Sequence, residues 1–169
     1  RALILLEEGR VWDAVPLLEP ALKAIEGRHD CADFFLVVVL RIWRDHKDSL
    51  PEEVRIRMKR AVLGFRYWLD EPGNDVMWFW SENHALCFHA AQHVAGTLFP
   101  EEVFSNSGLS GAEHARLGAE RLWRWFASAE KHGFAEWNSA AYYPIDFLGL
   151  LTLFDMSADQ EIADRARRQ

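Results

Sequence analysis

Apolar residues recur along nearly the whole chain at the three- and four-residue spacing that places them on one face of an α-helix. No segment shows the sustained alternation of apolar and polar residues that marks a half-buried strand. We therefore predict an all-α fold, because a helical pattern cannot line one face of a sheet. The expected helices cover about residues 12–26, 30–46, 51–69, 81–98, 110–131 and 139–155, with a last helix from about 158.

The expected helices alternate in character along the chain. Helices that are apolar on most sides are each followed by an amphipathic, charge-rich helix, and the pair repeats about every fifty to sixty residues. This order predicts antiparallel helical hairpins in an array, either open or closed into a ring. The apolar helices would form an inner layer and point the same way, so that their N-termini gather on one side. They begin near Asp30, Ser81 and Ser139, and the amphipathic ones near Pro51, Gly111 and Ala158.

Short polar motifs mark the expected helix starts. Ser81 is placed to cap the second inner helix, and three other serines belong to sequences typical of a capping box. In that motif a serine and a side chain three residues later each bond the other's backbone N–H. The three pairs are Ser49 with Glu52, Ser110 with Glu113, and Ser157 with Gln160.

Composition narrows the class of protein. The 169 residues suit one domain, and a net charge of -7 without a basic face argues against a nucleic-acid partner. The longest apolar run, Phe34–Leu40, is too short to cross a bilayer, so no membrane partner is expected.

Cys31 and Cys87 lie in apolar helical patterns and are interpreted as buried free thiols. We expect a single soluble domain over residues 1–169. Since the chain starts as RALILL, already in helical pattern, it is expected to be either a fragment of a larger protein or a mature product.

The stretch WFWSENHALCFHAAQHVAG, residues 78–96, concentrates polar and aromatic side chains at the start of an inner helix. Glu82, Asn83 and His84 fall in its first turn, where free backbone N–H groups and the helix dipole favour an anionic ligand group. Polar clusters also start the two neighbouring inner helices, and the hairpin arrangement predicts that all three converge. These clusters are His29, Asp30 and Asp33 on one side, and Asn138, Ser139, Tyr142 and Tyr143 on the other.

The inner and outer hairpins, an Asn-His pair at one inner helix and tyrosines at the next together resemble the polysaccharide lyases of the α/α-toroid type. Alginate lyases and heparinase-like enzymes are examples. The resemblance covers about residues 30–155, and its specific motif is Asn83-His84 followed by Tyr142 or Tyr143. It implies an α/α-toroid, here incomplete or reduced, since a full ring needs more hairpins than this length supplies. The chain departs from the family by having Glu82 where many members have a second Asn, and by its negative net charge.

The resemblance implies cleavage of a uronic-acid glycan by β-elimination, in which the C5 proton is removed and the 4-linked oxygen leaves. Asn83 or a protonated Glu82 would bond the sugar carboxylate and stabilise the enolate-like intermediate. His84 or a tyrosinate would take the proton, and Tyr142 or Tyr143 would return one to the leaving oxygen. The structural alternative is that Glu82 and Asn83 only stabilise the helix start and that His84 is a buried core histidine.

Aromatic and acidic residues near these positions extend the candidate site. Three tryptophans, Trp78, Trp80 and Trp137, would stack on sugar rings or else cover the core. The carboxylates that a glycoside hydrolase on the same scaffold would need are supplied by Glu82, Glu136 and Asp146. The alternatives are a solvated turn for Glu136 and a polar contact inside the helix bundle for Asp146.

His89 and His93 have the i, i+4 spacing that puts two imidazoles on one helix face, as metal ligands need. No third ligand of a suitable type lies near them, and the acidic residue of the zinc-protease motif is absent. We therefore expect no metal at these histidines, and no cofactor.

The sequence favours a carbohydrate-active protein, first a polysaccharide lyase and second a glycoside hydrolase. A non-catalytic helical-repeat scaffold is the third hypothesis, because residues 5–25 have the Gly and Ala spacing loosely seen in tetratricopeptide-like hairpins. The expected partner is a carbohydrate. No sequence feature indicates a compartment or an oligomeric state.

Overall fold

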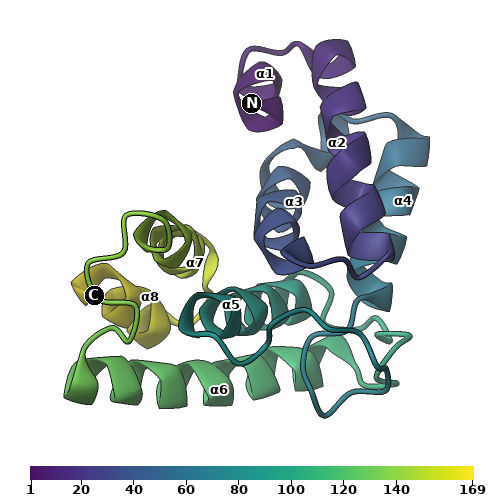
Figure 1. Cartoon of the computed structure of the whole chain (residues 1–169). Coiled ribbons are helices and arrows are strands. Elements are labelled where there is room, and N and C mark those ends of the chain that lie inside the picture. The colour runs from purple at the N-terminus through teal and green to yellow at the C-terminus, as the bar shows by residue number, and fades with distance from the viewer.

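The computed structural model describes all residues 1–169 and confirms the all-helical fold (Figure 1). The only strand-like pairing is an isolated bridge between Val103 and Ser110. None of the helices has both the length and the apolar character needed to cross a membrane. The helices are α1 (Ala2–Glu7), α2 (Val11–Glu26), α3 (Ala32–His46), α4 (Glu52–Gly64), α5 (Glu82–Leu98), α6 (Gly111–His132), α7 (Tyr143–Met156) and α8 (Gln160–Arg168), with a 3₁₀ turn at Lys47–Ser49.

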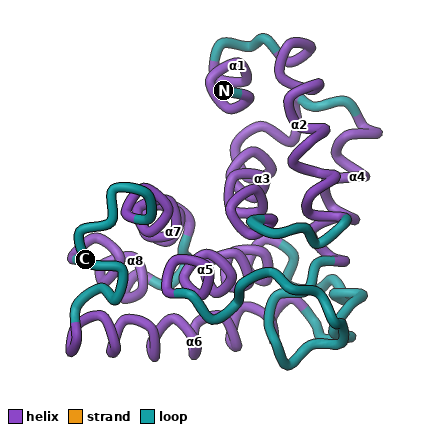
Figure 2. Tube along the Cα trace, viewed as in Figure 1, coloured by secondary structure: helices purple, strands orange, loops and turns teal.

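Helix α5 lies in the middle of the molecule. It packs against α6, α7 and α3, while α3 also contacts α7. Figure 1 shows α1 to α4 grouped on one side and α5 to α8 on the other, with α3 and α5 meeting between the groups. The long connections 65–81 and 99–110 appear as loops at the same end of α6 in Figure 2. They are joined by the side chain of Asn106, which donates hydrogen bonds to Glu71 Oε2 and to the carbonyl oxygen of Pro72.

The hydrophobic core has two parts, and α5 contributes to both. A cluster of 26 buried residues draws on α1 to α5 and the adjoining loops, and a cluster of 10 draws on α5 to α8. Phe88 and Val94 of α5 pack in the larger cluster, whereas Leu86 and Ala90 pack in the smaller one. As a result, 13 of the 17 residues of α5 are buried.

Helix α4 ends at Gly64 rather than near residue 69, so the predicted boundary is wrong. Phe65 leaves the helix in an extended conformation (φ -72°, ψ 149°) and its side chain is fully buried in the core. The Arg66 guanidinium then donates hydrogen bonds to the carbonyl oxygens of Leu69 and Glu71. Core packing and this buried arginine therefore replace the last helical turn that the apolar pattern predicts.

Helix α7 begins at Tyr143, later than the predicted start near Ser139. Pro144 stands in its first turn, where the missing N–H of proline has no intrahelical partner to lose. Residues 133–142 form the connection before it, and Asn138 in this loop has a left-handed backbone (φ 55°).

Of the three predicted capping boxes, one is confirmed and two are wrong. Ser110 and Glu113 form the expected capping box of α6. Ser49 instead lies in the 3₁₀ turn, where its hydroxyl donates to the carbonyl oxygen of His46. Helix α8 is capped by Asp159 rather than Ser157, because the Asp159 carboxylate accepts from the first backbone N–H groups of the helix.

Two glycines allow the backbones of α5 and α6 to approach closely. A Cβ atom at Gly118 would lie 2.5 Å from the backbone nitrogen of His93, and one at Gly96 would lie 2.3 Å from that of Ala115. Because the obstructing atoms belong to helix backbone, a larger residue at either position has to push the helices apart.

We expect Gly118→Ala to lower the free energy of unfolding by about 2 kcal/mol, because overpacking outweighs the roughly 1 kcal/mol by which alanine favours a helix over glycine. Urea denaturation would measure the change. Gly64→Ala is the control, since its Cβ would meet only the Ser105 hydroxyl at 3.6 Å. Equal stability of the two variants would show that the close approach is not required.

Candidate functional site

A cavity of about 450 Å³ opens where α3, α5 and α7 begin; we call it the His84 cavity. All three helix starts contribute to its walls, so the predicted convergence is met in part. Several residues of the predicted clusters do not line this cavity, namely His29, Asp33, Glu82, Asn138, Ser139 and Tyr143. Its polar lining residues include Asp30, Cys31, Asn83, His84, Glu136 and Tyr142.

His84 is held by a buried carboxyl group from α3. Its Nδ1 lies 2.9 Å and 3.0 Å from the two carboxylate oxygens of Asp33, and its ring stacks on Phe34 with a centroid distance of 4.4 Å. Burial raises the pKa of Asp33, while the hydrogen bond from His84 acts in the opposite direction. Since Nδ1–H donates to Asp33, the neutral imidazole keeps Nε2 as its basic nitrogen. Asp33 therefore fixes the orientation of the His84 ring at the wall of the cavity.

Asn83 is buried beside His84, and its amide is fixed in one orientation. Its Oδ1 accepts the Ser81 hydroxyl at 2.8 Å and the backbone N–H of His84 at 2.7 Å. No protein group accepts a hydrogen bond from its Nδ2 group, which leaves that donor for a ligand. Ser81 is the N-cap residue of α5, as predicted, although its side chain does not bond the helix backbone.

Cys31 is a correction to the prediction of a buried thiol, since it is only partly buried and lines the His84 cavity. It is the N-cap residue of α3 with a left-handed backbone (φ 64°), and its sulfur lies within 4.8 Å of a His84 ring nitrogen and an Asp30 oxygen. Burial, followed by the charges of Asp30 and Asp33, raises the pKa of Cys31. A nucleophilic cysteine needs a lowered pKa, so this thiol is poorly suited to that role.

The two candidate tyrosines face different cavities. Tyr142 lines the His84 cavity and is about half exposed. Tyr143 lines a smaller cavity with Trp137, and its hydroxyl oxygen accepts the backbone N–H of Asn138 at 2.7 Å. Only Tyr142 is therefore placed to act with His84 on one ligand.

Three carboxyl groups meet between the His84 cavity, which Glu136 lines, and the smaller cavity of Tyr143, which Asp146 lines. Oxygens of Glu82, Glu136 and Asp146 all lie within 4.8 Å of one another, and Glu82 Oε2 accepts the backbone N–H of Glu136 at 3.2 Å. Burial, and then the charges of Glu136 and Glu82, raises the pKa of Asp146 to about 7. Burial also raises the pKa of Glu136. Glu136 is the only member of this group that lines the His84 cavity.

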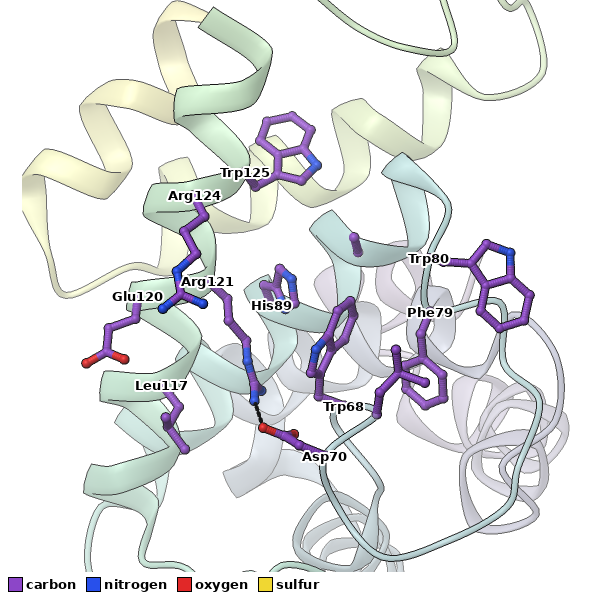
Figure 3. Close-up of a pocket in the computed structure, with 12 residues that line it drawn as sticks. Trp68, Asp70, Phe79, Trp80, His89, Leu117, Glu120, Arg121, Arg124 and Trp125 are labelled. Atoms are coloured by element: carbon purple, nitrogen blue, oxygen red, sulfur yellow. Dashed lines mark hydrogen bonds and ion pairs between the residues drawn. The ribbon is translucent and has the colours of Figure 1, made fainter. Parts of the chain in front are cut away.

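A second cavity, of about 580 Å³, lies on the other side of the α5 start; we call it the Arg124 cavity (Figure 3). It is bounded by α6 and by the loop that carries Phe79 and Trp80, and Figure 3 shows His89 and Trp68 between these walls. Trp125 closes one end and donates its indole N–H to the carbonyl oxygen of Glu82 at 3.2 Å. The cavity thus combines aromatic walls with charged groups from α6.

The charges of the Arg124 cavity leave one cation without a partner. Arg121 pairs with Asp70 at 2.6 Å, its guanidinium also donates to Gln92 Oε1, and Glu120 pairs with Arg116. Arg124 makes no ion pair or hydrogen bond with any protein group. Its exposed guanidinium is available to an anion.

The tryptophans of the loop before α5 join the two cavities. Trp78 lines the His84 cavity and Trp80 the Arg124 cavity, and their ring centroids are 5.2 Å apart. Trp78 is about half exposed (48%) and Trp80 is 61% exposed, and neither packs against the two hydrophobic clusters. Trp137 is 79% exposed and lines the smaller cavity beside Tyr143.

The two histidines of the H-x-x-x-H spacing have separate surroundings. His93 hydrogen-bonds through Nδ1 to the carbonyl oxygen of Ala115 and through Nε2 to the Ser157 hydroxyl. His89 lines the Arg124 cavity, and its buried Nδ1 has no protein partner. His93 therefore has a protein partner at each ring nitrogen, whereas His89 does not.

Sequence reasoning missed the Arg124 cavity. One face of α6 carries Arg121, Arg124 and Trp125. The sequence nevertheless predicts α6 as an amphipathic outer helix whose charged side faces water. Trp68 lies in a segment predicted as helix, and its place against His89 (4.2 Å between ring centroids) depends on the irregular loop after α4. The spacing of Arg121, Arg124 and Trp125 along α6 was the feature of the sequence from which this cavity could have been predicted.

No family model, no curated protein and no solved structure significantly matches this chain.

The pKa of His89 makes the free energy of unfolding depend on pH. Burial, followed by the charges of Arg121 and Arg124, lowers the pKa of His89 from 6.5 to about 3. The unfolded chain therefore binds a proton that the folded chain excludes, so the free energy of unfolding falls as the pH drops below about 6.5.

Because the pKa of His89 is lower in the folded than in the unfolded chain, this residue should lower the free energy of unfolding by about 2–3 kcal/mol between pH 7 and pH 4.5. We expect His89→Gln to abolish that part of the pH dependence. Urea unfolding at several pH values would measure it. His132→Gln, at an exposed position, is the control and should leave the pH dependence unchanged. Identical pH profiles for wild type and His89→Gln would contradict the assignment.

Proposed function

We propose that this chain carries the catalytic site of a polysaccharide lyase that cleaves uronic-acid glycans by β-elimination. The observation that carries the proposal is that Asn83, His84 and Tyr142 line one cavity, with His84 oriented by Asp33. These are a carboxamide, a base and an acid, which are the three groups that this elimination needs.

The chemical step uses each group once. His84 Nε2 takes the C5 proton, and the electrons of the C–H bond form the C4–C5 double bond. The bond from C4 to the glycosidic oxygen breaks, and the Tyr142 hydroxyl donates its proton to that oxygen. The Asn83 Nδ2 group donates to the uronate carboxylate as negative charge develops on it. Proton exchange with water then restores His84 and Tyr142.

The Arg124 cavity supports an anionic glycan as the substrate. The chain as a whole is acidic, so a polyanion needs a local cation, and Arg124 is a cation without a protein partner. In the proposed complex, the glycan runs from the His84 cavity across Trp78 and Trp80. Their exposed rings would stack on sugar faces, and Arg124 would bind the carboxylate of a further uronate unit.

The scaffold that we propose is an incomplete or reduced α/α-toroid, with α3, α5 and α7 as inner helices. Their mutual packing supports this arrangement. The outer positions would belong to α4, α6 and α8, of which α6 packs on α5 and α8 packs on α7.

A glycoside hydrolase is the second candidate, because Glu136 and Asp30 both line the His84 cavity and Glu136 has a raised pKa suited to a general acid. Of the three carboxylates predicted for this role, Glu82 and Asp146 do not line the cavity. The second carboxylate would then have to be the exposed Asp30.

Incubation with a panel of uronate-containing polysaccharides should produce an ultraviolet absorbance from the unsaturated uronate. His84→Ala and Tyr142→Phe should each lower kcat about a hundredfold or more, as expected for a lost acid or base. Tyr143→Phe is the matched control and should retain most activity, because its hydroxyl serves the loop. New reducing ends without absorbance would instead identify a hydrolase, and no turnover of any glycan would remove both proposals.

Arg124→Ala should raise KM for the cleaved polyuronate about tenfold, because a charge-assisted hydrogen bond to a carboxylate is lost, and should leave kcat within about twofold. Steady-state kinetics at low ionic strength would measure both constants. Arg167→Ala, an exposed arginine in α8, controls for the change in net charge. An unchanged KM would exclude the Arg124 cavity from substrate binding.

A further inference from the structure

We propose that Glu82, Glu136 and Asp146 form a binding site for a divalent cation of the size of Ca²⁺. The three carboxylates come from the first turn of α5, the loop before α7, and the first turn of α7. Glu136 lines the His84 cavity and Asp146 lines the smaller cavity beside Tyr143, so the site lies between these two cavities. It is separate from His89 and His93.

The spacing of the three oxygens suits coordination. Oxygen atoms that all lie within 4.8 Å of one another have a common point no more than about 2.8 Å from each. Ca²⁺ binds oxygen ligands at about 2.3–2.6 Å in a flexible geometry. Small side-chain rotations would therefore bring one oxygen of each residue to coordination distance.

The environment of Asp146 is an independent indication of a ligand. Its side chain is 3% exposed, points at the other two carboxylates, and neither of its oxygens accepts a hydrogen bond from the protein. Glu136 Oε2 is also buried without a partner. Buried polar atoms nearly always have partners in folded proteins, and a cation would give Asp146 and Glu136 a partner that the protein does not supply.

No cation of the protein neutralises this group. None of the three residues takes part in an ion pair with a lysine, arginine or histidine, although 18 such contacts occur elsewhere in the chain. Three carboxylates brought together without a positive partner repel one another, and a divalent ion reverses that balance.

The type of ligand favours a hard cation. All donors are carboxylate oxygens, which suit Ca²⁺, Mg²⁺ and Mn²⁺ better than zinc or copper. Mg²⁺ requires oxygens at about 2.0–2.1 Å in near-ideal octahedral geometry, which demands a more exact placement of the three side chains than the flexible geometry of Ca²⁺. Bound Ca²⁺ would tie the loop of residues 133–142, which ends in Tyr142, to the start of α5.

Terbium, a luminescent substitute for Ca²⁺, provides a direct test on the full chain after treatment with a chelator. Trp125 contacts the backbone of Glu82, so its excitation should sensitise bound Tb³⁺. We expect saturable luminescence that Ca²⁺ displaces, and a rise in Tm with Ca²⁺ that exceeds the rise with Mg²⁺. No substrate is involved, so the result is independent of the lyase proposal.

Asp146→Asn should weaken Tb³⁺ and Ca²⁺ binding at least tenfold, and it preserves the side-chain shape so that the variant folds. Glu101→Gln, at an exposed acidic position, is the control and should bind as wild type does. The proposal is overturned if Tb³⁺ gives no sensitised luminescence, or if Asp146→Asn binds as tightly as wild type. An equal Tm rise with Mg²⁺ would overturn the assignment to Ca²⁺.

Discussion

The burial of α5 is the constraint on which the rest of the structure depends. One helix supplies side chains to both hydrophobic clusters, so it must be covered by α3, α6 and α7 together. Gly96 and Gly118 let the α6 backbone reach it closely. A helix covered in this way has no free side for polar residues. Polar side chains in the first turn of α5 therefore need either hydrogen-bond partners or contact with a cavity.

The candidate chemistry follows from that restriction. His84 finds the buried carboxyl group of Asp33, and Asn83 finds Ser81 and a backbone N–H, so both side chains are fixed before any ligand arrives. Such preorganisation is what acid–base catalysis requires of a base and of a charge-stabilising donor. Asp146 is the exception, because it is buried without a partner. The lack of a protein partner for this buried carboxylate supports the proposed cation site.

The two cavities divide the proposed work between the sides of the α5 start. The His84 cavity holds groups that can move protons, whereas the Arg124 cavity offers an unpaired cation among aromatic rings. The exposed Trp78 and Trp80 connect the two. An acidic protein can in this way bind an anionic glycan, since the field at a surface depends on local charges rather than on the net charge.

The sequence by itself determined that the chain is helical and the order of the helices from α2 to α8, although it did not predict the short α1. Helical periodicity and local polarity could be predicted because they are properties of neighbouring residues. It also singled out Asn83, His84, Glu136 and Tyr142, although the catalytic roles of these residues remain proposals. Only the tertiary structure decided that α4 stops at Gly64, that Tyr142 rather than Tyr143 faces His84, and that Cys31 lines a cavity. It also decided that Arg124 lacks a partner and that three carboxylates meet. These outcomes depend on contacts between residues tens of positions apart, which no local pattern specifies.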